Sequence, residues 1–255
     1  MKIKEKYVEK YCGVTPKKYE QLDDRYKKTL QIFSKHKFEK ILDIGCGDGN
    51  FSVLLKEACK AKEVYGIEIS EKGAEMARKN GVKCYQLDVD EEDFPFEDNY
   101  FDAVTALELI EHLFDPDHFL EEVYRVLKPE GIFVLSTPNL ASIHNRIALL
   151  FGYQPFSMNP SHRYRVGHIT EIFNLHKFNP DDGVKREADH IHLFTLKALK
   201  MLLHRYNFKI VKVYGAKVKT NILKSKFAKI FEVLETIVSK NPSFSLQVIV
   251  MAKKG

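Results

Sequence analysis

Between residues 40 and 137, short apolar runs alternate with amphipathic segments, and this alternation limits the possible folds more than any other feature of the sequence. The runs at 40–44, 63–68, 82–87, 101–107 and 132–137 have the length of buried strands, and helical patterns separate most of them. Two further strands are expected at 208–214 and 246–252. Strands that alternate with helices form right-handed crossovers and a mostly parallel sheet. We therefore predict a Rossmann-like α/β fold with seven strands and helices on both faces of the sheet.

Several helix boundaries can be predicted from local signals. Ser70 is placed to cap a helix that runs to about Asn80, and Thr195 to cap one that runs to about Tyr206. Asp115 followed by Pro116 combines a favoured N-cap with a favoured first helical residue. We also expect helices at 50–59 and 139–150, and an amphipathic helix at 222–238.

The chain is predicted to form a single domain over residues 1–255, with four parts. Residues 1–38 are expected to form a helical N-terminal cover, and residues 40–137 the α/β core, which contains a glycine-rich turn. Residues 139–194 are rich in histidine, asparagine and proline and show little periodicity, so we expect a lid on the substrate side. Residues 195–255 supply the last helices and strands.

Composition excludes several classes of protein and indicates a compartment. The hydrophobic fraction of 44% is ordinary for a globular chain, and no apolar run reaches the length of a membrane span. The first residues carry positive charge but no apolar segment, so we expect no secretory leader. The four cysteines form no CxxC pair and are interpreted as free thiols in a reducing cytoplasm.

A glycine-rich turn, DIGCGDG at residues 43–49, lies between the first predicted strand and the next helix. Glycines allow the turn and let a ligand approach the backbone closely. A nicotinamide or flavin site would instead have the pattern GxGxxG. Here the third glycine, Gly49, comes one residue too early, and Asn50 stands where that pattern has Gly or Ala. A dinucleotide-dependent oxidoreductase therefore remains a weaker alternative.

The turn resembles the DxGxGxG motif of class I S-adenosylmethionine-dependent methyltransferases, and the resemblance extends over residues 40–137. The segments FPF at 94–96, FDAV at 101–104 and LKPEG at 127–131 are similar to other motifs of that family. The resemblance implies that S-adenosylmethionine is bound, with Glu68 at the ribose hydroxyls and Asp88 at the adenine amino group. The full implied cofactor-binding set is Asp43, Gly45, Cys46, Gly47, Gly49, Glu68, Ile69, Asp88, Val89 and Leu107.

Two carboxylates and a histidine follow the fourth predicted strand in the segment LELIEH at 107–112. If this segment is helical, Glu108, Glu111 and His112 share one face. With the later His190, the pattern resembles ubiquinone-pathway O-methyltransferases and small-RNA 2′-O-methyltransferases. That resemblance implies a divalent metal on Glu108, Glu111, His112 and His190, with His112, His190 and Glu111 as catalytic residues. The alternative, without a metal, makes His112 a general base or a residue of the cofactor loop, and Glu111 a local hydrogen-bonding partner.

Charge is distributed unevenly along the chain, although its net value is only +5. Residues 43–130 hold nine basic and 22 acidic residues, and both flanks are basic. Seven lysines and no acid lie between positions 209 and 229, which suits an RNA or an anionic membrane surface, or simply a solvated face.

The predicted reaction is methyl transfer to a hydroxyl of a small-molecule or lipid-like substrate, with a metal-assisted 2′-O-methyltransferase acting on RNA as the alternative.

Overall fold

The computed structural model describes residues 22–160, 166–168, 190–218 and 235–255. Their strands form one seven-stranded sheet in the order β3-β2-β1-β4-β5-β7-β6. The strands are β1 (Lys40–Ile44), β2 (Glu63–Glu68), β3 (Lys83–Gln86), β4 (Phe101–Leu107), β5 (Leu127–Pro138), β6 (Phe208–Ala216) and β7 (Gln247–Lys254). The first five pair in parallel, and β7 runs antiparallel to both β5 and β6. The prediction of a seven-stranded, mostly parallel sheet is confirmed.

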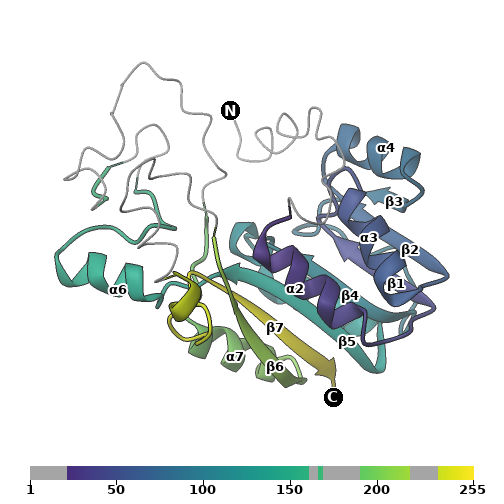
Figure 1. The fold of residues 1–255 in the computed structure, drawn as a ribbon. Coiled ribbons are helices and arrows are strands. Elements are labelled where there is room, and N and C mark those ends of the chain that lie inside the picture. Colours follow the sequence, from purple (N-terminus) through teal and green to yellow (C-terminus); the bar gives the residue numbers. More distant parts are fainter. Residues whose placement is uncertain (1–21, 161–165, 169–189, 219–234) are drawn as a thin grey trace.

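Helices cover both faces of this sheet (Figure 1). One face carries α2 (Asp24–Phe33), α3 (Asn50–Cys59) and α4 (Glu71–Lys79), and the other carries α5 (Pro116–Val126) and α7 (Leu196–Arg205). Helix α6 (Ile143–Leu150) lies beyond the end of the sheet rather than against its faces (Figure 1). The two-sided arrangement expected from the alternating pattern is therefore present.

Side chains of neighbouring residues in one strand point to opposite faces of the sheet, so they pack in the two different hydrophobic cores. In β1, Ile41 packs with α2 and α3, whereas Leu42 packs with the aromatic and aliphatic residues beneath α5. In β5, Phe133 and Val134 divide in the same way. This double burial explains why the central strands read as nearly continuous apolar runs.

The three predicted helix caps are confirmed. The hydroxyl of Ser70 accepts a hydrogen bond from Gly73 N, and that of Thr195 accepts one from Ala198 N. The Asp115 carboxylate accepts from the backbone N–H groups of Asp117 and His118. Each cap satisfies N–H groups that the first turn of a helix cannot pair internally.

Two element boundaries differ from the prediction. The turn at 129–131 was expected to precede the fifth strand, but β5 begins at Leu127 and includes it. Phe101 pairs with Leu127 and Ala103 with Ile132, so the register shifts and the intervening residues form an irregularity within the strand. The helix expected at 139–150 begins only at Ile143, because Asn139 forms a bridge with Phe194 and Ser142 caps the helix.

Some predictions fall outside the described residues: the helix at 222–238 up to position 234, the first 21 residues of the N-terminal cover, Cys12, and lid residues 161–165 and 169–189. The division of the chain into cover, core and lid stays a prediction. In the part of the chain that the structure describes, no helix combines the length and apolar character needed to cross a bilayer.

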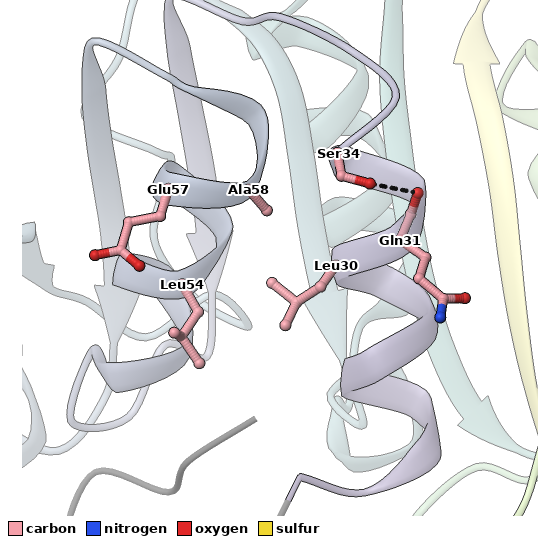
Figure 2. Close-up of a pocket in the computed structure, with 6 residues that line it drawn as sticks. All are labelled: Leu30, Gln31, Ser34, Leu54, Glu57 and Ala58. Carbon is pink, nitrogen blue, oxygen red and sulfur yellow. Dashed lines mark hydrogen bonds between the residues drawn. The ribbon is translucent and has the colours of Figure 1, made fainter. Parts of the chain in front are cut away.

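A shallow groove separates α2 from α3 (Figure 2). Leu30 and Leu54 face it from the two helices, and Ser34 and Ala58 lie near its other end. These residues belong to the later turns of α2 and α3, whereas the glycine-rich turn precedes the first residue of α3. The groove is therefore at the opposite end of α3 from the predicted cofactor site.

Candidate active site

The glycine-rich turn connects the carboxyl end of β1 to the first residue of α3. Gly45, Gly47 and Gly49 have φ values of 73°, 57° and 77°, in the left-handed region that favours glycine. Gly49 is the N-cap of α3, and the backbone N–H of Asn50, the first residue of that helix, donates to Asp48 Oδ1. Hydrogen bonds from Gly45 N and Cys46 N to the Ile67 carbonyl hold the turn at the carboxyl ends of β1 and β2, where α/β proteins bind ligands.

Asp43, in β1 just before the turn, is buried. Ser52 donates a hydrogen bond from Oγ to Asp43 Oδ2 at 2.6 Å. Burial raises the pKa of the Asp43 carboxyl to about 7, although the Ser52 hydrogen bond opposes the shift. The side chain therefore anchors the start of α3 to β1 from beneath the turn.

Glu68 ends β2 and is held by backbone donors on both sides. Gly47 N donates to one carboxylate oxygen at 2.8 Å, and Ser70 N donates to the other at 2.9 Å. Burial raises the pKa of Glu68 despite these hydrogen bonds. Because a carboxylate oxygen accepts more than one hydrogen bond, each oxygen keeps capacity for a ligand hydroxyl.

The remaining predicted cofactor residues follow the neighbouring strands. Asp88 comes after β3, is half-buried and accepts a hydrogen bond from Asp90 N, and Val89 beside it is buried. Leu107 ends β4 and is half-buried. Cys46 is buried within the turn, with its Sγ 3.5 Å from that of Cys84 in β3. The fold thus brings the ends of β1, β2, β3 and β4, with their predicted residues, to one edge of the sheet.

Glu111, His112 and His190 form a cluster beyond the end of β4, with one potential ligand atom of each within 4.8 Å of the others. Glu111 is buried, and one of its carboxylate oxygens accepts a hydrogen bond from Thr137 Oγ1 at 2.9 Å. The other, Oε1, lies 3.9 Å from His112 Nε2 and has no hydrogen-bond partner among the residues that the structure describes. Burial, followed by the nearby Glu108 charge, raises the pKa of Glu111.

His190 joins this cluster from the short segment that precedes α7. Its ring centroid lies 4.8 Å from that of His112, and its Nδ1 is 2.6 Å from the carbonyl oxygen of Ser157. The Glu111 carbonyl accepts hydrogen bonds from Ile191 N and His192 N, which fixes the segment after His190. A carbonyl only accepts, so Nδ1 is the donor, and in the neutral imidazole this places the lone pair on Nε2.

Glu108 is not a member of this three-residue cluster, although its charge acts on Glu111, and the expected shared helical face is not formed. Only Ile110–His112 form a single 3₁₀ turn, and Glu108 has φ 55°. Its carboxylate accepts hydrogen bonds from Ser136 Oγ at 2.8 Å and Gln247 Nε2 at 2.6 Å. Its role as a metal ligand stays a prediction that this arrangement does not favour.

Sequence reasoning missed Arg25 of α2, whose guanidinium lies 3.4 Å from Gln247 Oε1. Arg25 is influenced electrostatically by Glu108 and contributes to the field at Glu111, so it belongs to the same edge of the sheet. Its Nε is buried and has no hydrogen-bond partner within the described ranges. No local signal distinguishes Arg25 from the other basic residues of the first 42 positions.

A family model described as a methyltransferase domain matches residues 18–213. The chain belongs to this methyltransferase family. The match includes the glycine-rich turn, Glu68, Asp88 and the Glu111–His112–His190 cluster. The resemblance to class I S-adenosylmethionine-dependent methyltransferases is therefore confirmed, and the dinucleotide-dependent oxidoreductase is no longer supported.

Individual relatives of this methyltransferase are similar over only part of their length. A probable S-adenosylmethionine-dependent methyltransferase of Mycolicibacterium smegmatis is 29% identical over 56% of this chain and 52% of its own. A ubiquinone biosynthesis O-methyltransferase of Actinobacillus pleuropneumoniae is 32% identical over 47% of this chain and 52% of its own. The matched segment thus spans about half the length of these curated relatives.

A solved structure shows the Rossmann-like fold over nearly the whole chain. It is a methyltransferase of Thermotoga maritima described as a possible histamine N-methyltransferase, with TM-score 0.58 and 21% identity. The alignment covers 91% of this chain and 90% of that one. At this identity the similarity concerns the fold alone.

Proposed function

We propose that this methyltransferase transfers the methyl group of S-adenosylmethionine to a hydroxyl oxygen of a small-molecule or lipid-like acceptor. The observation that carries the proposal is the cluster of Glu111, His112 and His190 at the same sheet edge as the glycine-rich turn. An acceptor hydroxyl must lose a proton, and imidazole is the side chain best suited to take it near neutral pH. The relative named as a ubiquinone biosynthesis O-methyltransferase supports a hydroxyl acceptor.

The residues around the turn fit the cofactor's polar groups. S-adenosylmethionine, when bound, supplies a methyl group on a positively charged sulfur that is already activated for attack. Glu68 would accept hydrogen bonds from the ribose hydroxyls, and Asp88 would accept one from the adenine amino group. Arg25, whose Nε has no hydrogen-bond partner among the described residues, would pair its guanidinium with the methionine carboxylate. The left-handed glycines leave the backbone open to close approach.

Calorimetry with S-adenosylhomocysteine tests this cofactor site. The substitution Gly47→Val adds a branched side chain where φ is 57°, so we expect it to abolish measurable affinity. Val211→Ala, at an exposed position of β6, serves as the control and should bind normally. Unchanged affinity of the Gly47 variant would contradict the assignment.

His190 is the preferred general base. The Ser157 carbonyl fixes the proton on Nδ1, which leaves Nε2 to take the proton of the acceptor hydroxyl. His112, whose ring lies beside that of His190, is the second candidate. The chain's remaining task is to hold acceptor and methyl group in line and to exclude water from the site.

A divalent metal is the alternative way to activate the hydroxyl. One buried carboxylate oxygen without a described partner and two imidazoles form a donor set that suits several divalent ions. Glu111, His112 and His190 would hold the ion, which would lower the pKa of the hydroxyl. Metal analysis and activity after chelation separate the two mechanisms, because full activity in a metal-free enzyme would exclude this one.

A screen with labelled methyl donor over metabolites, lipids and RNA tests the acceptor class. We expect label on a hydroxyl of a metabolite or lipid, and a decrease of about 10²- to 10⁴-fold for His190→Ala. His204→Ala, at an exposed position of α7, is the matched control. Label on RNA, with retention that falls steeply with salt, would instead establish the 2′-O-methyltransferase alternative.

We also propose a cytoplasmic location. Cys46, Cys59 and Cys84 are buried free thiols, which suits a reducing compartment. Cell fractionation followed by thiol counting tests this assignment, and recovery in a secreted fraction would contradict it.

A further inference from the structure

Helix α6 and the residue after it expose four large apolar side chains. Ile147, Leu149, Leu150 and Phe151 are 44%, 54%, 79% and 66% exposed. Ile147, Leu150 and Phe151 are three and four residues apart, so they lie on one side of the helix. Single exposed apolar residues are normal, but a contiguous group indicates a contact surface.

The segment at 239–245 extends this apolar group. Ile143 N donates to the carbonyl oxygen of Phe244 at 3.0 Å, and the Arg146 guanidinium lies 5.0 Å from the centre of the Phe244 ring. Phe244 is itself exposed. We refer to this set as the α6 surface: Arg146, Ile147, Leu149, Leu150, Phe151 and Phe244.

In the two described segments that form the α6 surface, residues 139–160 and 235–245, the exposed charges have one sign. Residues 139–160 contain no aspartate or glutamate, and residues 235–245 contain only Glu235. Glu235 is buried, with Oε1 2.9 Å from His144 Nε2, so it does not contribute an exposed negative charge. Arg146 and Lys240 are exposed cations. An apolar patch with exposed cations, and without an exposed acid in its own described segments, complements an anionic lipid surface, where both components favour binding.

We propose that the α6 surface docks this protein on an anionic lipid bilayer. Leu150 and Phe151, the most exposed of its apolar residues, enter the boundary between headgroups and acyl chains. Arg146 lies at the level of the lipid phosphates. Helix α6 lies beyond the end of the sheet (Figure 1), so the sheet and its covering helices do not separate this surface from a membrane.

Two hydrogen bonds connect the docking surface to the candidate base. Asn145, on the buried side of α6, accepts a hydrogen bond from Phe156 N at 2.8 Å. The residue after Phe156 is Ser157, and its carbonyl oxygen lies 2.6 Å from His190 Nδ1. Docking would therefore bring the acceptor side of the site close to the bilayer. The corollary that the acceptor is an amphiphile taken from the membrane rests on the proposed function, whereas docking itself does not.

Vesicle sedimentation tests the proposal directly. We expect the protein to sediment with phosphatidylcholine vesicles that contain about one-third phosphatidylglycerol, and far less with phosphatidylcholine alone. Leu150→Glu should lower the partition coefficient about tenfold or more, because a leucine that leaves water contributes at least that factor. Met201→Glu is the matched control: Met201 is 62% exposed on α7, outside the α6 surface, and its substitution should leave binding unchanged.

Substituting the cations tests the electrostatic part. Arg146→Gln and Lys240→Gln should each weaken binding about fivefold at low salt, and the difference should shrink as salt is raised. Melting temperature and S-adenosylhomocysteine binding confirm that each variant is folded.

Two results would overturn the proposal. One is no sedimentation of the unmodified protein, or equal sedimentation of the Leu150 and Met201 variants. The other is a dimer in analytical ultracentrifugation that Leu150→Glu dissociates while vesicle binding persists, which would assign the surface to a second copy of the chain. A His190→Ala variant should still sediment, so failure of docking and failure of the proposed reaction can be distinguished.

Discussion

Gly49 and Gly81 have similar backbone conformations in different surroundings. Their φ values are 77° and 88°, but a Cβ on Gly49 would lie 2.8–2.9 Å from Ala77 and Val82, whereas one on Gly81 would meet no described atom within 4 Å. Gly81→Ala should therefore lower the free energy of unfolding by only about 1–2 kcal/mol, the strain of the left-handed region. Gly49→Ala should lose about 1–3 kcal/mol more through overpacking. Urea unfolding measures both, and equal losses would contradict the close approach.

The raised pKa of Asp43 should make the stability of the folded protein depend on pH. Its pKa rises from 3.8 to about 7 on folding, so the folded state keeps a proton that the unfolded chain releases. The contribution of this group to stability is therefore full below pH 4 and is lost as the pH rises through about 7. Asp43→Asn removes the titration but keeps an oxygen for the Ser52 hydroxyl.

The comparison of Asp43→Asn with the unmodified protein isolates this effect. We expect the variant to gain stability relative to the original between pH 4 and pH 7, and the difference to level off above that range. Thermal melts of both proteins across pH 4–8, without cofactor, provide the measurement. A constant difference over this range would show that Asp43 is not perturbed by burial.

At the scale of elements, Arg125 of α5 anchors the segment that connects β3 to β4 through several hydrogen bonds. Its guanidinium donates to the carbonyl oxygens of Phe94 and Phe96 and to the Glu122 carboxylate, which also accepts from Phe94 N. Arg125→Lys keeps the charge but loses the fork of donors, so we expect a loss of about 2 kcal/mol in unfolding free energy. The exposed Lys62–Glu39 ion pair is the control, and Lys62→Ala should have no measurable effect. An unchanged unfolding free energy of the Arg125→Lys variant would contradict the importance of this hydrogen-bond network.

The same scale shows what could be predicted from sequence and what could not. Caps at Ser70, Asp115 and Thr195 depend on residues two or three positions away, so local patterns suffice. The orientation of Glu108 depends on Gln247, 139 positions later, and on a left-handed backbone at a non-glycine residue. Arg25 contacts the same Gln247 across 222 positions. Such long-range contacts leave no local periodicity, so the sequence located the strand ends around the glycine-rich turn but not the positions of Glu108 and Arg25, and the roles of all these residues stay predictions.

For the molecule as a whole, cofactor binding should appear as added stability. A ligand at about 100 times its dissociation constant stabilises the folded state by about 2.7 kcal/mol, or roughly 5–10 °C in melting temperature for a chain of this size. We expect S-adenosylhomocysteine to produce this shift and a nicotinamide dinucleotide to produce none. The Gly47→Val variant should melt at the same temperature with and without S-adenosylhomocysteine. A shift with the dinucleotide alone would contradict the cofactor assignment.

The position of β7 has a consequence for how the chain is made. It is the last strand in sequence, yet it lies between β5 and β6 and pairs with both. While the chain is being synthesised from its N-terminus, β6 cannot join the sheet until residues 247–254 have emerged from the ribosome. Until then, β5 presents an unpaired apolar edge of the kind that recruits other chains. A chain truncated before residue 247 would therefore lack β7 and leave β5 and β6 without their shared partner. We expect such a chain to aggregate, and not only to lose activity.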